Sequence, residues 1–252
     1  MTWKKTYDGD EPVRVNKWLA QHGVCSRREA ETLIAEGQVL IDGEQVEDVG
    51  RKISAGQTLT LERAGAQKLE SQQTYVLNKP VGYVSSQPEK GQTTAVKLLN
   101  RSNCEDGSLA PKKSAKLAPL GRLDQDSRGL LLLSEDGALA KAVIGPDSRI
   151  DKEYLVRFEG ELNNRKLALL RHGLTLDGKP LKPAKVRHEA DDTLRFVLTE
   201  GRNRQIRRMC AAVGLRVVDL LRLRIGPVHL GALEEGRWRL LRADERAALL
   251  KG

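Results

Sequence analysis

The apolar pattern of the chain changes at a polar segment, residues 63–73, and this change constrains the fold more than any other feature. Before the segment, apolar residues recur at helical spacing and then alternate; after it, they gather in short runs typical of strands. The segment itself shows no apolar periodicity, which indicates a linker. A chain of 252 residues can hold a large domain and a small module. We therefore predict a small domain over residues 1–62 and a large one over residues 74–252.

The small domain is predicted to contain two helices followed by strands. Residues 13–20 carry apolar residues at helical spacing. Ser26 and Glu29 have the spacing of a capping box at the start of a second helix, which Gly37 would end. The dipeptide Asp42-Gly43 between apolar residues predicts a hairpin with a type I′ turn. Together these features indicate a small αα-β module.

The large domain is predicted to be a mixed, mainly antiparallel sheet with helices, so the whole chain belongs to the α+β class. Strands are expected at residues 75–77, 130–133, 154–156 and 194–198, and helices near residues 136–144, 161–172 and 203–213. Residues 101–116 hold few large apolar side chains and are predicted to form a mobile surface insertion with four basic residues: Arg101, Lys112, Lys113 and Lys116.

Positive charge is concentrated in separate clusters. The chain has a net charge of +9, yet residues 1–62 contain 8 Lys/Arg and 11 Asp/Glu, which leaves +12 for the remainder. Seven arginines fall between residues 199 and 224. Four cations lie between residues 13 and 28 with no acid among them: Arg14, Lys17, Arg27 and Arg28. Such clusters favour a polyanion such as RNA or DNA, and a solvated basic face is the alternative.

Membrane and metal-binding classes have little support in the sequence. No apolar run approaches the roughly 20 residues that span a bilayer, and the first residues lack the apolar core of a signal peptide. We expect a cytoplasmic protein. Cys25, Cys104 and Cys210 are too far apart for a Cys-x-x-Cys site, and the four histidines are scattered. We therefore expect neither a bound metal nor a redox pair.

Asp124 lies in a polar loop that leads into four consecutive leucines. Taken alone, such an aspartate is most often a turn or capping residue. Asp124, Asp126, Gly129 and Glu135 also match positions 1, 3, 6 and 12 of an EF-hand calcium loop. Arg128 occupies one of the ligand positions, however, and the leucines that follow are predicted to be a strand. We interpret the calcium pattern as a chance match.

Two sets of motifs resemble known families. Residues 13–19, 26–30, 34–39 and 42–43 are similar in order and spacing to the S4 RNA-binding domain. Four further motifs resemble, in family order, those of the RsuA-like RNA pseudouridine synthases: Leu77 to Gly82 (LNKPVG), Gly121 to Leu130 (GRLDQDSRGL), Asp151 to Val156 (DKEYLV) and Glu200 to Met209 (EGRNRQIRRM). Their wording is most similar to the branch of the family that modifies large-subunit rRNA.

The resemblance implies isomerisation of uridine to pseudouridine in structured RNA. No group enters or leaves in that reaction, so no cofactor is expected. Asp124 would be the nucleophile, Tyr154 would stack on the flipped-out base, and Arg207 would keep Asp124 ionised in a closed pocket. Arg122 would fill the gap that the base leaves in the stack. Attack at C1′, attack at C6 and a glycal route all stay open.

The resemblance also implies a set of RNA-binding residues and a partner. Arg122 is one RNA-binding residue, through the base stack, and the others would hold backbone phosphates: Arg14, Lys17, Ser26, Arg27, Arg28, Arg202 and Arg204. We expect large-subunit rRNA as the substrate, tRNA as a second candidate, and a monomeric enzyme. A non-catalytic RNA-binding or ribosome-assembly protein is the alternative, because the S4-like module and the basic clusters alone would suit it.

Overall fold

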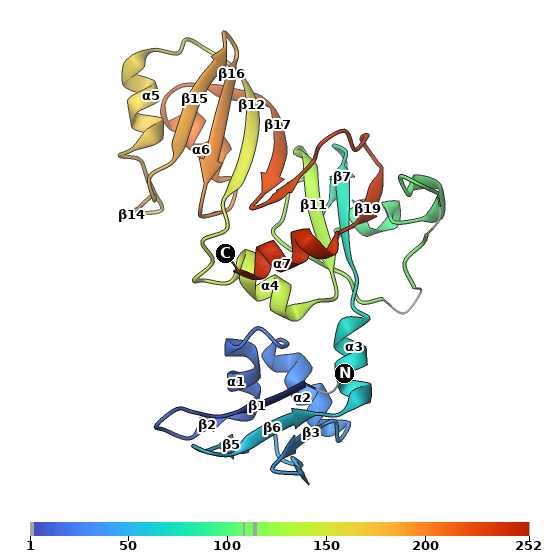
Figure 1. Ribbon diagram of the computed structural model, residues 1–252. Helices are drawn as coiled ribbons and strands as arrows, with labels where there is room; N and C mark the ends of the chain where they lie inside the picture. Colours follow the sequence, from blue (N-terminus) through green and yellow to red (C-terminus); the bar gives the residue numbers. More distant parts are fainter. Residues whose placement is uncertain (1–2, 108, 113–114, 252) are drawn as a thin grey trace. The chain divides into compact units, whose positions relative to one another are not determined.

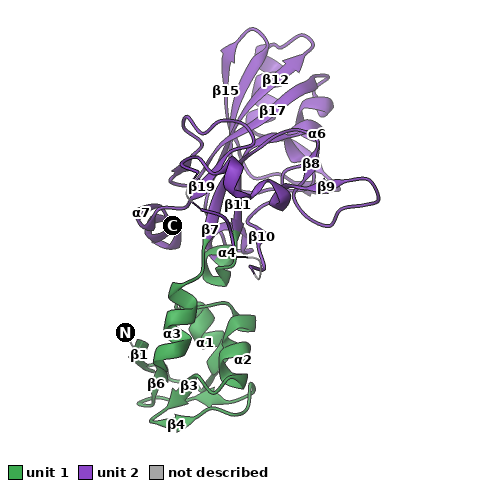
Figure 2. Ribbon diagram, turned by 90° about the vertical axis from the view of Figure 1, so that its right-hand side faces the viewer, with its two compact units in different colours: residues 1–73, 134–141 green, residues 74–133, 142–252 purple. Residues whose placement is uncertain are grey.

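The computed structural model describes residues 3–107, 109–112 and 115–251. The chain divides into two compact units, residues 1–73 with 134–141 and residues 74–133 with 142–252 (Figure 2). The first unit thus includes two segments beyond the predicted limit at residue 62. Lys113, one of the basic residues of the predicted insertion, lies outside the described residues.

The first unit is a small α+β fold. A four-stranded sheet runs in the order β1-β6-β3-β4, and a separate pair joins β2 to β5. The elements are β1 (Trp3–Thr6), β2 (Val13–Arg14), α1 (Val15–Gln21), α2 (Arg27–Ala35), β3 (Val39–Ile41), β4 (Glu44–Gln45), β5 (Lys52–Ile53), β6 (Thr58–Leu61) and α3 (Arg63–Glu70).

Local sequence signals explain most of this unit. The capping box is present: the Ser26 amide donates to Glu29 Oε2 at 2.6 Å and the Glu29 amide donates to Ser26 Oγ at 3.2 Å. Asp42 and Gly43 have φ of 51° and 89°, and both positive values are those of a type I′ turn. Helix α1 begins two residues later than predicted, because Val13–Arg14 pair with β5 as strand β2.

Residues 63–73, predicted as a linker, contain helix α3 instead. Leu69 packs against the core of the first unit, and the Gly65 amide donates to Gln38 Oε1 at 3.0 Å. The segment offers too few large apolar residues to show a helical period, so only its packing shows it to be part of the unit. The start of a later helix also joins this unit, because Lys141 Nζ donates to the Ala20 carbonyl at 2.9 Å.

The second unit contains the remaining elements, apart from residues 134–141, which belong to the first unit. These are β7 (Thr74–Lys79), β8 (Tyr83–Val84), β9 (Thr93–Thr94), η1 (Ala95–Leu98), η2 (Arg101–Asn103), β10 (Ala118–Pro119), β11 (Arg128–Ser134), α4 (Gly137–Ile144), β12 (Lys152–Glu159), α5 (Asn164–Arg171), β13 (Thr175–Leu176), β14 (Lys179–Pro180), β15 (Lys185–Ala190), β16 (Thr193–Leu198), α6 (Gln205–Ala212), β17 (Arg216–Ile225), β18 (Val228–His229), β19 (Trp238–Leu240) and α7 (Ala243–Lys251). Within the described ranges, no helix is both long and apolar enough to cross a membrane.

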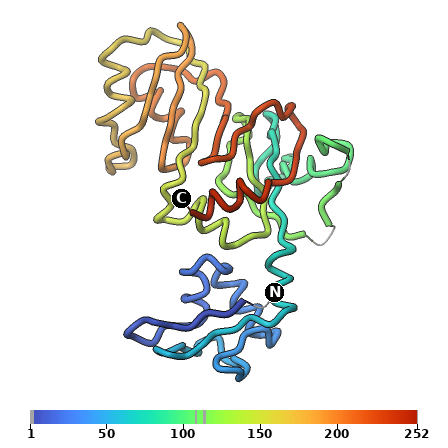
Figure 3. The backbone as a smooth tube through the Cα atoms, viewed as in Figure 1, coloured from blue at the N-terminus to red at the C-terminus, as the bar shows by residue number. Residues whose placement is uncertain are grey.

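One large sheet organises the second unit, in the order β15-β16-β12-β17-β11-β7-β19 (Figure 1). The β12·β16, β12·β17 and β15·β16 pairs are antiparallel, whereas β11 and β17 are parallel. These two strands are distant in sequence but lie side by side in the sheet (Figure 3). The predicted mixed, mainly antiparallel sheet is therefore confirmed, as are its predicted strands and helices.

Two hydrophobic cores lie along this sheet. The first combines Val156, Leu194 and Phe196 of the sheet with Ile206 and Met209 of α6. The second combines residues from the opposite half of the sheet: Tyr75, Leu77, Leu131, Leu133 and Trp238. Tyr154 of β12 packs against both cores. Tyr154 lines the candidate site, together with residues of the loop before β11 and residues at the start of α6.

Candidate active site

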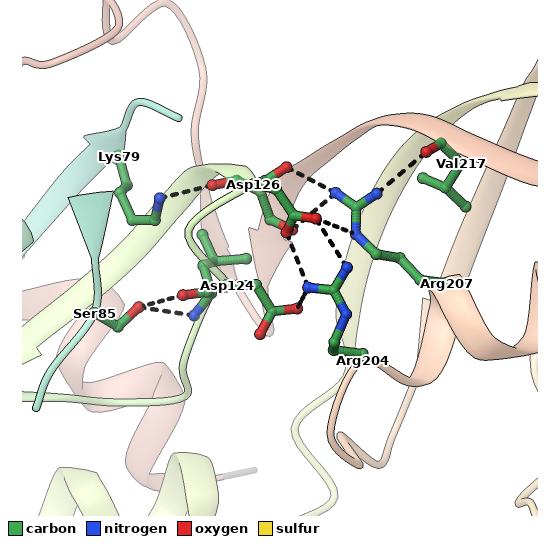
Figure 4. Close-up of polar contacts among 9 residues, drawn as sticks. Lys79, Ser85, Asp124, Asp126, Arg204, Arg207 and Val217 are labelled. Atoms are coloured by element: carbon green, nitrogen blue, oxygen red, sulfur yellow. Dashed lines mark hydrogen bonds and ion pairs between the residues drawn. The ribbon is translucent and has the colours of Figure 1, made fainter. Parts of the chain in front are cut away.

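The loop that carries Asp124 connects β10 to β11 and is held on both sides of that residue (Figure 4). Before it, Ser85 Oγ donates to the Leu123 carbonyl at 2.7 Å and accepts from the Leu123 amide at 2.9 Å. After it, Lys79 Nζ donates to the Ser127 carbonyl at 2.7 Å. Arg128–Ser134 then form β11, which confirms that this stretch is a strand and not a calcium loop.

Asp124 lines a pocket of about 480 Å³. The Asp124 side chain is 25% exposed, so the carboxylate is accessible but not fully solvated. The pocket also brings together predicted site residues from three separate sequence motifs, namely Arg122, Tyr154, Arg202, Arg204 and Arg207. A pocket of this size falls within the range of small-molecule sites and can hold a nucleobase.

Arg204 is the cation that faces Asp124. Its Nη1 lies 3.4 Å from Asp124 Oδ2, and its Nη2 donates to Asp126 Oδ2 at 2.8 Å (Figure 4). Arg204 immediately precedes α6 and adopts a left-handed backbone conformation, with φ of 48°. Arg207 was predicted to be the charge partner of Asp124, and the structure places Arg204 there instead.

Arg207 binds the neighbouring part of the loop. Its Nη2 donates to the Asp126 carbonyl at 2.7 Å, and its Nη1 donates to the Val217 carbonyl at 3.2 Å. Its Nε lies 3.4 Å from Asp126 Oδ2, and its side chain is only 13% exposed. Arg207 therefore ties the main chain of the loop to β17. Arg208, the other arginine of this turn, pairs with Asp177.

The carboxylate of Asp126 contacts both Arg204 and Arg207. The hydrogen bonds from Arg204, together with the charges of Arg207 and Arg204, hold the pKa of Asp126 below its usual value despite partial burial. From the sequence, Asp126 was interpreted only as part of a chance calcium-loop match. Two features of the sequence could have indicated this position. Asp126 lies two residues after Asp124, and the EGRNRQIRRM motif is rich in arginines that could pair with it.

Tyr154 lies on β12 between Phe196 of β16 and Arg222 of β17, its partners in the sheet register. The side chain is partly buried and reaches the same pocket as Asp124. Its packing against both cores leaves its ring in a defined place beside the pocket. The stacking role of Tyr154 stays a prediction.

Two predicted RNA contacts have other partners in the structure. Arg202 donates to the carbonyls of Leu176, Lys179 and Pro180, so it anchors the β13–β14 hairpin. The Ser26 hydroxyl and amide are both engaged in the helix cap. The remaining candidates of the first unit have exposed side chains: Arg14, Lys17, Arg27 and Arg28.

Comparison with known proteins identifies the family. The sequence model described as RNA pseudouridylate synthase matches residues 73–212, and that of the S4 domain matches residues 13–59. The chain belongs to the RNA pseudouridine synthases. It is 34% identical over 244 residues to the dual-specificity RNA pseudouridine synthase RluF of Escherichia coli O6:H1, covering 96% of this chain and 80% of RluF. The resemblance to the RsuA-like family is therefore confirmed.

Further relatives agree with this assignment. An RNA pseudouridine synthase of Aquifex aeolicus is 34% identical over 245 residues, which cover 95% of this chain and 94% of the relative. A crystal structure of a pseudouridylate synthase superposes with a TM-score of 0.64 and 31% identity, covering 94% of this chain and 99% of that one. The family favours an enzyme over the non-catalytic RNA-binding alternative.

The residues that support the loop of this synthase were not identified as a group from the sequence. Lys79 is fully buried, and burial followed by the charge of Arg222 lowers the pKa of Lys79 to about 8, although Asp126 and Asp124 act in the opposite direction. Lys79 belongs to the LNKPVG motif, but the motif alone does not show which main-chain group its amine binds. Arg222 appeared only within the count of basic residues.

Proposed function

We propose that Asp124 is the nucleophile with which this synthase isomerises uridine in structured RNA, and that large-subunit (23S) rRNA is its main substrate. The observation that carries this proposal is the shared pocket. The Asp124 carboxylate faces Arg204 at 3.4 Å, and Tyr154 and Arg207 line the same space. A nucleophilic carboxylate, a cation and an aromatic ring are the groups that the reaction requires.

The reaction exchanges one bond to C1′ for another. The N1–C1′ bond breaks, a C5–C1′ bond forms, C5 loses its proton and N1 gains one, so atoms balance without an oxidant or a metal. Asp124 attacks C1′ or C6, or promotes a glycal route. In each route the C5 proton is lost after the base has turned in the pocket, and Tyr154 stacks against the base during that turn.

The uridine reaches the pocket by flipping out of its helix, at a cost of a few kcal/mol. Arg122 is exposed at the edge of the pocket, two residues before Asp124, and fills the vacated position in the stack. The exposed cations of the first unit bind the RNA backbone, and Arg204 meets a phosphate or the developing charge near Asp124. Backbone contacts of this kind position RNA without reading its sequence.

The two carboxylates that contact Arg204 allow a sharp test of the nucleophile. The assay is release of tritium from RNA labelled with [5-³H]uridine in cells that lack the protein. Asp124→Asn should lower kcat at least about a thousandfold while leaving RNA affinity nearly unchanged. Asp126→Asn should lower kcat only about tenfold, because it removes an anchor and not the attacking group. Full turnover in Asp124→Asn would overturn the assignment.

The RNA target is tested separately by mapping pseudouridines in rRNA and tRNA from cells with and without the protein. We expect at least one site in large-subunit rRNA to be lost and to return with the wild-type gene. The dual-specificity relatives support a second RNA substrate, and we propose tRNA for it. An rRNA substrate implies a cytoplasmic enzyme, and we expect it to sediment as a monomer. Unchanged rRNA would contradict the proposed target but not the nucleophile.

A further inference from the structure

Arg222 of β17 donates hydrogen bonds to both ends of the loop that carries Asp124. Its Nε donates to the Leu130 carbonyl at 2.7 Å, after Asp124 in the chain. Its Nη2 donates to the Gly121 carbonyl at 3.1 Å and its Nη1 to the Arg122 carbonyl at 3.4 Å, both before Asp124. A single planar guanidinium therefore joins the segment that enters the loop to the segment that leaves it.

The burial of this side chain is costly. Arg222 is 2% exposed, and its hydrogen-bond acceptors among the described residues are main-chain carbonyls, without a carboxylate. A buried cation without a counter-charge is a weak way to stabilise a core, because an apolar side chain of similar volume avoids the desolvation penalty. Arg222 also lies close enough to Lys79 for its positive charge to lower the pKa of that lysine. Two buried cations, Lys79 and Arg222, thus donate hydrogen bonds to main-chain carbonyls around Asp124.

The sheet register places Arg222 between two strands: β11, which follows the loop of Asp124, and β12, which carries Tyr154. On one side, Gly129 of β11 is its parallel partner, and a Cβ on Gly129 would lie 2.4 Å from the Arg222 carbonyl oxygen. On the other side, Tyr154 of β12 is its antiparallel partner. Arg222 thus connects the strand of the stacking residue to the loop of the nucleophile.

We propose that Arg222 is a positioning residue that fixes Asp124 relative to Tyr154 by holding the loop of Asp124 at both ends. The inference rests on the proposed role of Asp124. Three fixed donors on one rigid plane are needed, because the acceptors lie on two separate chain segments. A displacement of about 1 Å at a reacting group costs roughly a hundredfold in rate. The effect should therefore fall on turnover, because Arg222 is buried and its hydrogen bonds go to the loop of Asp124.

The test compares Arg222→Met and Arg222→Lys with the wild type in the tritium-release assay. Arg222→Met should lower kcat roughly a hundredfold and change KM less than about threefold. Arg222→Lys keeps the charge but not the fork, and should recover only part of kcat. Hydrogen exchange of the amides in residues 121–130 should increase in both variants, while exchange elsewhere in the sheet stays the same.

Arg239→Met is the control for general destabilisation. Arg239 is a partly buried arginine that, unlike Arg222, pairs with a carboxylate, that of Glu245 on α7, and it does not line the pocket of Asp124. This variant should lower the melting temperature and leave kcat near the wild-type value. The positioning role is overturned if Arg222→Met keeps wild-type kcat, or if kcat merely follows melting temperature across the three variants. If Arg222→Met does not fold, the kcat and loop exchange of Arg222→Lys decide.

Asp124→Asn is assayed in parallel so that the two proposals can fail separately. Turnover in Asp124→Asn overturns the nucleophile assignment whatever the Arg222 variants do. An inactive Asp124→Asn beside a fully active Arg222→Met overturns the positioning role alone.

Discussion

Arg204 forms a bidentate pair with Asp126, in which Nη1 and Nη2 donate to Oδ1 and Oδ2 at 3.1 and 2.8 Å, and its Nη1 also lies 3.4 Å from Asp124 Oδ2. The shorter contact is with Asp126, so Asp124 is the more weakly held of the two acids. A carboxylate that is paired loosely is easier to direct towards a substrate than one locked in a bidentate pair. Asp126 thus holds Arg204 near Asp124, the proposed nucleophile, while Asp124 itself stays outside the bidentate pair.

Removal of Arg204 is expected to impair catalysis more than removal of its neighbour Arg208. Arg204→Met takes away the charge that faces Asp124 and should lower kcat roughly tenfold or more. Arg208→Met, in the same helical turn but paired with Asp177, is the matched control and should stay within about twofold of wild type. Equal kcat values in the two variants would contradict the importance of the Arg204–Asp124 contact.

The exposed cations of the first unit should affect binding and not turnover. Arg14→Ala and Lys17→Ala should each remove one contact with an RNA phosphate. The slope of log K for RNA binding against the logarithm of salt concentration should then become shallower by about one per residue. Saturating RNA should restore wild-type kcat. Lys68→Ala, at an exposed position paired with Glu36, is the control and should leave the slope unchanged. Filter binding over a range of salt concentrations measures all three; identical slopes would refute RNA contact by this surface.

Gly129 should tolerate no side chain. It has φ of 103°, and an added Cβ would lie 2.4 Å from the Arg222 carbonyl oxygen and 2.7 Å from Leu221 Cδ1. Gly129→Ala should therefore lower the free energy of unfolding by about 3 kcal/mol or more. Gly91→Ala separates backbone strain from the steric clash, because Gly91 has φ of 88° but open space around it. This substitution should cost only about 1–2 kcal/mol of unfolding free energy. Urea denaturation compares them, and equal losses would show that the contact with Arg222 is unimportant.

Lys152 should make stability depend on pH in the alkaline range. It is buried, and its Nζ donates to the Val143 and Ile150 carbonyls at 3.0 and 2.9 Å. Burial, followed by the charge of Arg222, lowers the pKa of Lys152 to about 8, whereas an unfolded lysine has a pKa of about 10.4. Between these values the unfolded chain binds more protons, so this residue's contribution to the free energy of unfolding rises with pH.

Lys152→Met removes that contribution. The difference in unfolding free energy, wild type minus variant, should be constant below about pH 8 and should then increase by at most about 3 kcal/mol towards pH 10.4. Urea denaturation at a series of pH values measures it, and Lys90→Met at an exposed position controls for the loss of one lysine. A difference that stays flat, or falls, across this range would show that Lys152 titrates normally.

Local structure and the membership of the site could be predicted from the sequence. The Ser26–Glu29 cap and the Asp42-Gly43 turn involve residues a few positions apart, so local backbone preferences determine them. The strands and helices of the second unit follow from apolar periodicity in the same way. The four family motifs identified which segments would meet, and Asp124, Tyr154 and Arg207 do line one pocket.

Only the tertiary structure decided how those segments bind one another. The choice of Arg204 over Arg207 as the partner of Asp124 depends on the left-handed conformation before α6 and on its position against the loop. The connection from Arg222 to Gly121 and Leu130 depends on the parallel register of β11 and β17. Such contacts join residues about a hundred positions apart. Local backbone preferences cannot predict them, because the packing of the whole sheet determines them.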